Sequence, residues 1–179
     1  MNASWARPLH SLQIDEASTD TQIAQVRDLF GELAALDLGH VRRLGLSEED
    51  AWRFVFKSGA EILPGDYGPP GGRLLLATVE QKVAGCGAYR RLDAQTCELK
   101  RLFVRPEFRG LRVGRRLAES LIETARKAGY RRMLLDTTTY LQAAQQLYAA
   151  LGFRPCPLYA EIPQSLRAIT IAMERALTD

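Results

Sequence analysis

Residues 98–116 read ELKRLFVRPEFRGLRVGRR and run directly into the helical pattern of residues 117–128, LAESLIETARKA. The first seven residues have the apolar content of a strand, and Arg105-Pro106 ends it, because proline cannot extend a strand ladder. The helix then opens with glycines and arginines, although the first turn of a helix normally favours acidic residues. Since free backbone amides at a helix N-terminus bind phosphate readily, this strand, turn and helix predict a cradle for an anion.

The segments on either side of this stretch alternate between strand patterns and helix patterns. Strands are predicted at 10–17, 72–80, 83–92, 96–104, 131–137 and 167–175, with a further one near 153–159, and helices at 21–36, 47–56, 113–128 and 141–151. We find no repeat, low-complexity tract or linker in the sequence. Residues 1–179 are therefore predicted to form a single α/β domain built on a mixed sheet.

The composition is that of an ordinary water-soluble domain. The net charge of +3 does not by itself imply a nucleic-acid or membrane partner. No apolar run approaches the ~20 residues of a membrane span, and residues 1–13 lack a signal-peptide core, so we expect a cytoplasmic protein. The three cysteines have no CxxC spacing and only two histidines are present, so we expect reduced thiols and no metal site.

Three phosphate-binding motifs join a strand to a helix in this way. The P-loop needs GxxxxGK followed by Ser or Thr, and the dinucleotide fingerprint needs GxGxxG; neither pattern is present. The third is the coenzyme A loop, Arg/Gln-x-x-Gly-x-Gly/Ala, which residues 109–114 match at all but one fixed position. Together with the preceding ELKRLFV strand and LYAALGF at 147–153, this loop resembles the GNAT N-acetyltransferase superfamily.

The resemblance covers residues 72–159 and implies a mixed, mostly antiparallel sheet of six to seven strands flanked by helices. It also implies transfer of acetyl from acetyl-CoA to a primary amine of a small molecule or peptide, by direct attack on the thioester and without a metal. The backbone of Leu102, Phe103 and Val104 would pair with the pantetheine arm. The pyrophosphate would be held by the amides of the loop, namely Arg109, Gly110, Leu111, Arg112, Val113, Gly114 and Arg115.

Two positions depart from the family pattern. Arg112 stands where the family has its middle glycine. If that position needs a positive φ, arginine costs on the order of 1 kcal/mol there; if it does not, Arg112 adds a cation near the phosphates. Leu141 stands where the family often has asparagine, seven residues before Tyr148, so one side-chain hydrogen bond to the coenzyme is lost.

Strict alternation along the strand at 96–104 would place Glu98, Lys100, Leu102 and Val104 on one face. That mixture suits neither a core nor a solvent face. A β-bulge near Arg101 would repair the pattern, and bulges often lie next to active sites. The family has such a bulge, which splays two strands to admit the pantetheine.

Acyl transfer to an amine needs a neutral amine, a stabilised oxyanion and relief for the departing thiolate. A backbone N–H near Leu102 or Phe103 is the expected oxyanion donor. Glu98 is the candidate base, acting through water on an ammonium group; the alternative is an edge carboxylate paired with Lys100 or Arg101. Tyr148 is the candidate acid, a role that the resemblance assigns to it, and the alternative is a core aromatic.

Two other classes of function stay open. A coenzyme A-binding sensor without catalysis is compatible with Arg112 and Leu141. A nucleic-acid-binding module would use the basic cluster at 100–116, which explains the arginines and leaves the glycines and the LYAALGF helix unexplained.

The acceptor is the least specified part of this prediction. Loops at 37–71 and 153–165 are expected to border its pocket, and their composition fits many amines. A homodimer is also compatible with the sequence, with the final strand pairing across subunits. Candidate pocket residues in the two loops are Glu61, Asp66, Tyr67 and Tyr159, and the alternative for each is an ordinary surface residue.

Overall fold

The computed structural model describes residues 11–56 and 62–178, and each predicted strand and helix is present there. The strands are β1 (Leu12–Glu16), β2 (Arg73–Val79), β3 (Lys82–Arg91), β4 (Thr96–Val104), β5 (Arg132–Thr138), β6 (Arg154–Cys156) and β7 (Thr170–Ala176). The helices are α1 (Asp20–Arg43), α2 (Glu48–Phe56), α3 (Val113–Lys127), α4 (Gln142–Ala150) and α5 (Gln164–Arg167). His10, the first residue of the first predicted strand, lies outside the described residues.

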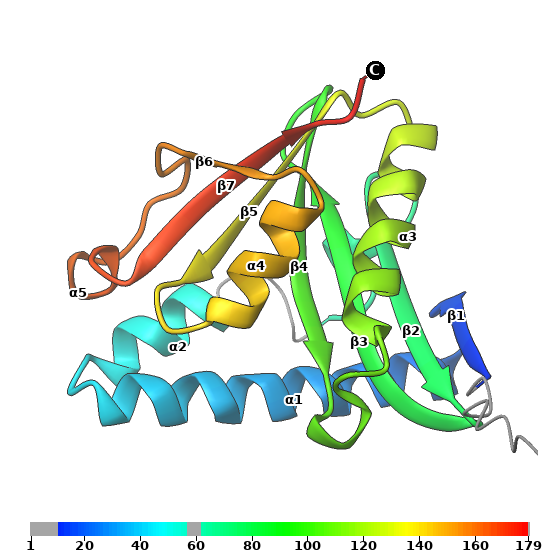
Figure 1. Cartoon of the computed structure of the whole chain (residues 1–179), viewed down its shortest axis with the longest axis horizontal. Coiled ribbons are helices and arrows are strands. Elements are labelled where there is room, and N and C mark those ends of the chain that lie inside the picture. The colour runs from blue at the N-terminus through cyan, green and yellow to red at the C-terminus, as the bar shows by residue number, and fades with distance from the viewer. Residues whose placement is uncertain (1–10, 57–61, 179) are drawn as a thin grey trace, which may run out of the picture.

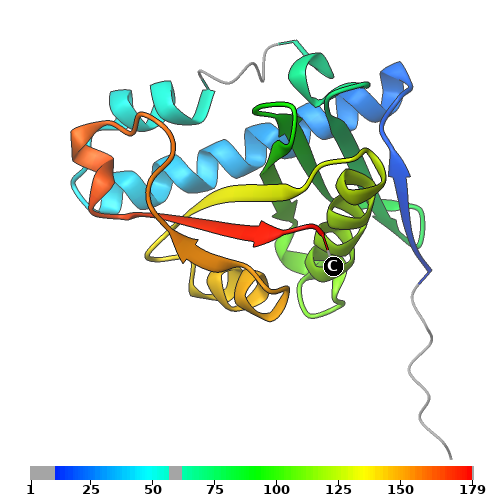
Figure 2. The same ribbon diagram turned by 90° about the horizontal axis from the view of Figure 1, so that it is seen from above.

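The strands form one seven-stranded mixed sheet in the order β1-β2-β3-β4-β5-β7-β6. Every neighbouring pair is antiparallel except β4 and β5, which run parallel. This confirms the predicted fold class. Helices α3 and α4 cover one face of the sheet, and α1 and α2 lie on the other (Figure 1); the view from above separates the same two layers (Figure 2).

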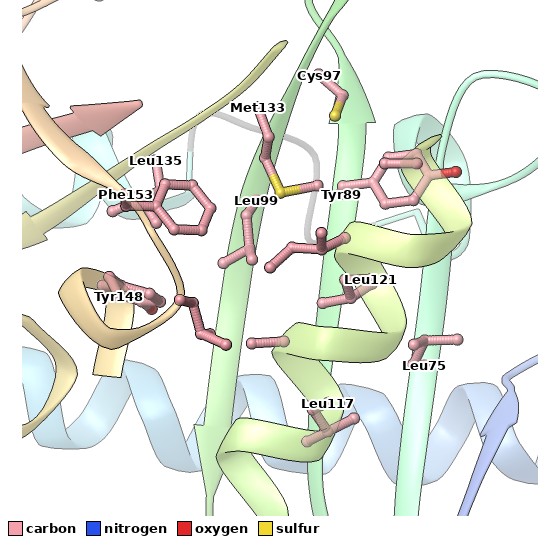
Figure 3. Close-up of a cluster of buried hydrophobic side chains, with 14 of the residues drawn as sticks. Leu75, Tyr89, Cys97, Leu99, Leu117, Leu121, Met133, Leu135, Tyr148 and Phe153 are labelled. Carbon is pink, nitrogen blue, oxygen red and sulfur yellow. The ribbon is translucent and has the colours of Figure 1, made fainter. Parts of the chain in front are cut away.

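The core has a larger part on the α3 side of the sheet and a smaller part on the α1 side. The apolar stripe of α3, which includes Leu117 and Leu121, packs on the sheet. Figure 3 shows Tyr148 and Phe153 on the β5 side of this core, across from the two α3 leucines. The α1 side is closed by side chains such as Phe30, which meets Tyr67 edge-to-face at 6.0 Å between ring centroids.

The predicted β-bulge in β4 is confirmed. Cys86 pairs with Phe103 and Ala88 pairs with Lys100, so two residues of β4 lie opposite Gly87 alone. Arg101 takes a positive φ of 58° at this point. The extra residue brings Leu102 and Val104 to the α3-side core, away from the face of Lys100, as the hydrophobic pattern requires.

Pairing between β4 and β5 covers only Thr96, Cys97 and Glu98 on the β4 side. Beyond Glu98 the bulge redirects β4, and the two strands have no further register with one another. The parallel pair therefore separates toward its carboxyl ends, in the middle of the sheet.

Two parts of the fold differ from the prediction. Helix α1 continues seven residues beyond the predicted end at residue 36, to Arg43, because Val41 is buried against α2 and α5. The final strand begins three residues late, because Gln164–Arg167 form α5. It also pairs with β5 and β6 on its two sides over Ala172–Glu174, so it is not the free edge that the predicted pairing across subunits requires.

Candidate active site

The N-terminus of α3 presents free backbone donors. Arg116 N–H is the first amide of this helix to reach an intrahelical carbonyl, that of Arg112, at 3.0 Å. The amides of Val113, Gly114 and Arg115 donate to no carbonyl in the part of the chain that the structure describes. Three N–H groups and the positive end of a 15-residue helix dipole therefore point out of the loop, an arrangement that suits a phosphate. Two of the predicted phosphate donors are instead engaged within the loop: the amide of Arg109 donates to Pro106 at 3.2 Å and that of Leu111 to Phe108 at 3.4 Å.

The glycines of the loop keep this N-terminus open. Gly110 has a φ of +83°, and a β-carbon placed on it would meet nothing within 4 Å. A β-carbon on Gly114 would come within ordinary contact of Val104 and Leu147, at 3.5 and 3.8 Å. The surroundings thus leave space beside the loop, and Gly110 also supplies a backbone conformation that other residues rarely adopt.

Arg112 is the residue before α3 and has φ 61° and ψ 14°, in the left-handed region. Its side chain is exposed and makes no capping hydrogen bond to the helix. The family's glycine position therefore does need a positive φ in this chain, and arginine there carries a cost of about 1 kcal/mol.

The arginines around the loop have different partners. Arg105 forms an ion pair with Glu32 of α1 at 2.7 Å and donates to the carbonyl of Val83, so it ties the end of β4 to the rest of the fold. Arg109 is exposed and donates from Nε to the carbonyl of Val104 at 3.3 Å. Arg115 lies 3.5 Å from Glu119 in the next turn of α3. Of these three, Arg105 is fixed by its contacts away from the loop amides.

A cavity of about 170 Å³ lies where β4 and β5 separate. On the α4 side it is lined by Leu102, Leu141, Ala144 and Tyr148, and on the α1 side by residues of α1, α2 and α5. Helices α4 and α1 lie on opposite faces of the sheet (Figure 1). Because residues of both line the cavity, it joins the two faces where β4 and β5 separate. A donor and an acceptor that enter from opposite faces can meet there.

Tyr148 is buried in the wall of this cavity and packs edge-to-face on Phe153, with 5.9 Å between ring centroids. Burial raises the pKa of the Tyr148 hydroxyl above its ordinary value, and the nearby Asp136 carboxylate adds to this effect. The side chain therefore stays protonated at neutral pH and can donate a hydrogen bond to a group inside the cavity.

Glu98 is 1% exposed and belongs to a central strand, so the edge position of the alternative prediction is wrong, whereas the pairing with Lys100 that it named is present. It accepts from Arg90 at 2.7 Å and from the Tyr159 hydroxyl at 2.8 Å, and it lies 3.1 Å from Lys100 Nζ. Glu98 does not line the cavity between β4 and β5. Its three contacts fix it beside the cavity as the centre of a buried polar network.

Sequence reasoning missed two carboxylates of the cavity, Asp37 on α1 and Asp136 on β5. Asp136 forms a short ion pair with Lys100. Asp37 fell in a stretch predicted as loop, although the spacing Leu33, Asp37, Val41 places it on one face of a continuing helix. An acidic residue inside an apolar helical stripe was the signal that could have identified it.

The four pocket residues predicted from the loops have other positions. Tyr67 is buried beneath α1, Asp66 is exposed, and Tyr159 donates to Glu98; none of these three lines the cavity. Glu61 lies outside the described residues. Leu141, which replaces the family's asparagine, is the residue before α4 and forms part of the apolar cavity wall.

In the described ranges, no helix is long and apolar enough to cross a membrane. The same residues contain no cluster of three or more histidines, cysteines or carboxylates that could hold a metal ion.

Comparison with known proteins gives a consistent result. The sequence profile of the acetyltransferase (GNAT) family matches residues 42–153. An uncharacterised N-acetyltransferase of Schizosaccharomyces pombe is 42% identical over 99 residues, which cover 54% of this chain and 61% of that relative. The match thus spans about three fifths of the relative's length.

Two solved structures have the same fold over nearly the whole chain. A GNAT-family acetyltransferase of Staphylococcus aureus Mu50 superposes with a TM-score of 0.71, at 22% identity, over 94% of this chain and all of that one. The PaiA N-acetyltransferase of Thermoplasma acidophilum, solved in complex with coenzyme A, gives 0.69 at 17% identity over 93% and 99% of the two chains.

Proposed function

The chain belongs to the acetyltransferase (GNAT) family, and from this premise we propose that it transfers acetyl from acetyl-CoA to a primary amine of a small molecule or peptide. The observation that carries the proposal is the cavity between β4 and β5, which joins the α4 face of the sheet to the α1 face. The thioester would enter from one face and the amine from the other.

The coenzyme half of this site is supported by the free amides at the start of α3. We place the pyrophosphate on the loop from Arg109 to Arg115 and the pantetheine arm along Leu102, Phe103 and Val104. The β4 backbone past Glu98 has no register with β5, so its polar groups on that edge are open to the arm. The PaiA protein, which has the same fold, was solved with coenzyme A bound.

Direct attack of the amine on the thioester carbonyl generates an oxyanion and then expels a thiolate. A β4 amide near Leu102 is the proposed oxyanion donor, since the bulge removes this stretch from the ladder. Tyr148 would stabilise the departing sulfur. Because burial raises its pKa above 10, and a thiol has a pKa of about 8.5, Tyr148 donates a hydrogen bond to the thiolate and keeps its own proton.

The sequence predicts Glu98 as the base, and this role stays a prediction. Its route to the acceptor would run through the Tyr159 hydroxyl or a water, because its carboxylate is held by Arg90 and Lys100 outside the cavity lining. The same contacts support a structural role, in which Glu98 fixes Lys100 toward Asp136.

The nucleic-acid alternative has little support in the structure. Lys100 is engaged with Glu98 and Asp136 inside the fold, and Arg105 is paired with Glu32. Two cations of the basic cluster, Lys100 and Arg105, are therefore not available as a phosphate-binding surface.

Coenzyme binding can be tested with two matched variants. Gly110 and Gly129 flank the two ends of α3, have φ values of +83° and +90°, and both face open space. Valine strains the backbone at either position, so both variants should lose thermal stability. Only Gly110→Val should lose the rise in melting temperature that acetyl-CoA gives, together with protection of residues 109–115 from hydrogen exchange.

Activity is measured as thiol release from acetyl-CoA across a panel of primary amines. Acetylation of at least one amine supports the proposal. Coenzyme binding without thiol release for any amine would favour the sensor, and the absence of any coenzyme-induced shift in the wild type would exclude both.

A further inference from the structure

The geometry points to Asp37 as the residue that receives the acceptor: the ammonium group of the amine lies against its carboxylate, and the carbon body of the amine rests on the apolar wall between α1, α2 and α5. This inference rests on the acetyltransferase activity proposed above and names the acceptor side of the same site. The acceptor class is a primary amine with one ammonium group on a hydrocarbon-rich body.

Asp37 holds a distinct position on its helix. Residues Leu33, Ala34, Leu38 and Val41 of α1 line the cavity with it, and all four are apolar. Asp37 is thus the one charged cavity residue of α1, a helix that the structure describes over its whole length. A carboxylate at the centre of an apolar stripe is costly unless something pairs with it.

The charge of Asp37 is not neutralised by a direct contact. Among the described residues, its side chain makes no hydrogen bond and no ion pair. Burial raises its pKa from 3.8 to about 6, although the more distant charges of Arg101 and His40 lower it. The Asp136 carboxylate on β5 adds to the rise. Tyr140, after β5, also faces this group, and its pKa is raised by burial and by Asp37.

The other two carboxylates near the cavity are already engaged. Asp136 pairs with Lys100, and Glu98 is held by Arg90, Lys100 and Tyr159. Asp37 is therefore the carboxylate with the most to gain from a bound cation. An ammonium group would supply the missing counter-charge and would be positioned for loss of a proton.

The walls around Asp37 determine what can accompany the ammonium. Beyond it the apolar lining comes from α1, α2 and α5 and from the turn after α5, through Leu38, Val41, Ala51, Leu166 and Ile169. The charged lining residues on β4 are Lys100 and Arg101, both cations. A hydrocarbon body suits the first surface, whereas at the other the Asp136 carboxylate is already paired with Lys100 and so offers a second ammonium group no ready counter-charge.

The chemical step balances without another reactant. The Asp37 carboxylate takes one proton from the ammonium, and the freed nitrogen lone pair attacks the acetyl carbonyl carbon. A C–N bond forms, the C–S bond breaks, and the sulfur leaves as a thiolate. The second N–H proton is lost as the amide forms, one proton ends on the thiol, and the other goes to water.

The test compares Asp37→Asn with Glu98→Gln, and uses Asp28→Asn as a control because Asp28 is an exposed aspartate on the same helix. The probe amines are 2-phenylethylamine and spermidine, at saturating acetyl-CoA. We expect Asp37→Asn to lower kcat/KM for 2-phenylethylamine by about 100-fold or more, while the coenzyme-induced thermal shift stays at the wild-type value. Asp28→Asn should match the wild type.

The pH profile separates a base from a structural residue. Wild-type kcat/KM should rise with pH and level off above the Asp37 pKa of about 6, because only the ionised carboxylate accepts a proton. Asp37→Asn should lack this limb, and Glu98→Gln should keep it. The wild type should also prefer 2-phenylethylamine to spermidine by about tenfold or more.

Three results would overturn the inference. If folded Asp37→Asn kept the kcat/KM of the wild type, Asp37 would have no role in receiving the amine. If the wild type preferred spermidine to 2-phenylethylamine, the proposed acceptor class would be wrong. Either result leaves the acetyltransferase proposal standing, since the wild type would still release thiol. Loss of the pH limb in Glu98→Gln, with the limb intact in Asp37→Asn, would assign the base to Glu98.

Discussion

The two halves of the cavity, on the α4 side and on the α1 side of the sheet, are formed by different kinds of chemical group. The proposed coenzyme half relies on the backbone: free amides in the first turn of α3, and a bulged strand whose pairing with β5 has ended. The proposed acceptor half relies on side chains carried by helices on the opposite face, with Asp37 in an apolar wall. A backbone site is altered mainly by changes in φ or by an added β-carbon, whereas a side-chain site changes with each substitution. On this proposal, the fold can keep one donor while the acceptor varies.

Glu98→Gln should give the largest effect, since Glu98 lies between the two halves with 1% of its surface exposed. The change leaves Arg90 and Lys100 without their shared carboxylate, and removing one partner of a buried ion pair costs roughly 3 kcal/mol. Urea denaturation measures the loss. Glu123→Gln is the control, because Glu123 pairs with Arg126 and Lys127 at the surface and should change the free energy of unfolding by less than about 0.5 kcal/mol.

An unchanged stability in Glu98→Gln would show that the buried network is not structural. In that case, a large loss of kcat in the same variant would show that Glu98, and not Asp37, is the base. The catalytic carboxylate would then lie at the boundary between the two halves.

Tyr148→Phe tests the coenzyme half alone. It removes the hydroxyl and keeps the edge-to-face contact with Phe153. We expect kcat to fall by about 10- to 100-fold, with no change in coenzyme KM or in the preference among amines. Tyr130→Phe is the matched control: its hydroxyl donates to the carbonyl of Gly71 at 2.7 Å, away from the cavity. That variant should lose about 1 kcal/mol of stability and keep kcat; equal losses of kcat in both would assign Tyr148 to packing.

Asp37→Asn should also make the protein more stable at neutral pH, which tests the acceptor half without any substrate. Because its pKa is raised from 3.8 to about 6, the folded state binds this proton more tightly than the unfolded state. The free energy of unfolding of the wild type should therefore fall as pH rises from about 4 to about 6, and stay lower above that range. Asparagine removes this loss, a gain on the order of 2 kcal/mol at about pH 8.

The gain should shrink as pH falls from about 6 to about 4, and it should vanish below about 4, where both states of the wild type are protonated. Denaturation curves at two pH values measure this. A pH-independent difference between the proteins would mean that Asp37 is not desolvated, and the acceptor site would lose its main electrostatic support.

The two halves also differ in how far they could be predicted. The coenzyme half lies mostly within residues 98–116, so its strand, bulge and loop follow from local patterns, and the bulge was confirmed at Arg101. The acceptor half comes from α1, α2, α5 and the end of β5, which are far apart in sequence. Asp37 was assigned to a loop because Gly39 and the charged residues after it weaken the helical signal. Only packing of Val41 against α2 and α5 extends the helix past it.

Arg112→Gly should give the smallest effect, with opposite signs in stability and binding. The φ of 61° suits glycine, so the free energy of unfolding should rise by up to about 1 kcal/mol. The exposed guanidinium lies next to the free amides of α3, so its loss should weaken coenzyme binding several-fold at low salt and less at high salt. Arg112→Asn separates the two effects, because asparagine also tolerates this conformation and carries no charge. If both variants bound coenzyme as tightly as the wild type, Arg112 would strain the backbone without contributing to coenzyme binding. The coenzyme half would then depend on backbone amides alone.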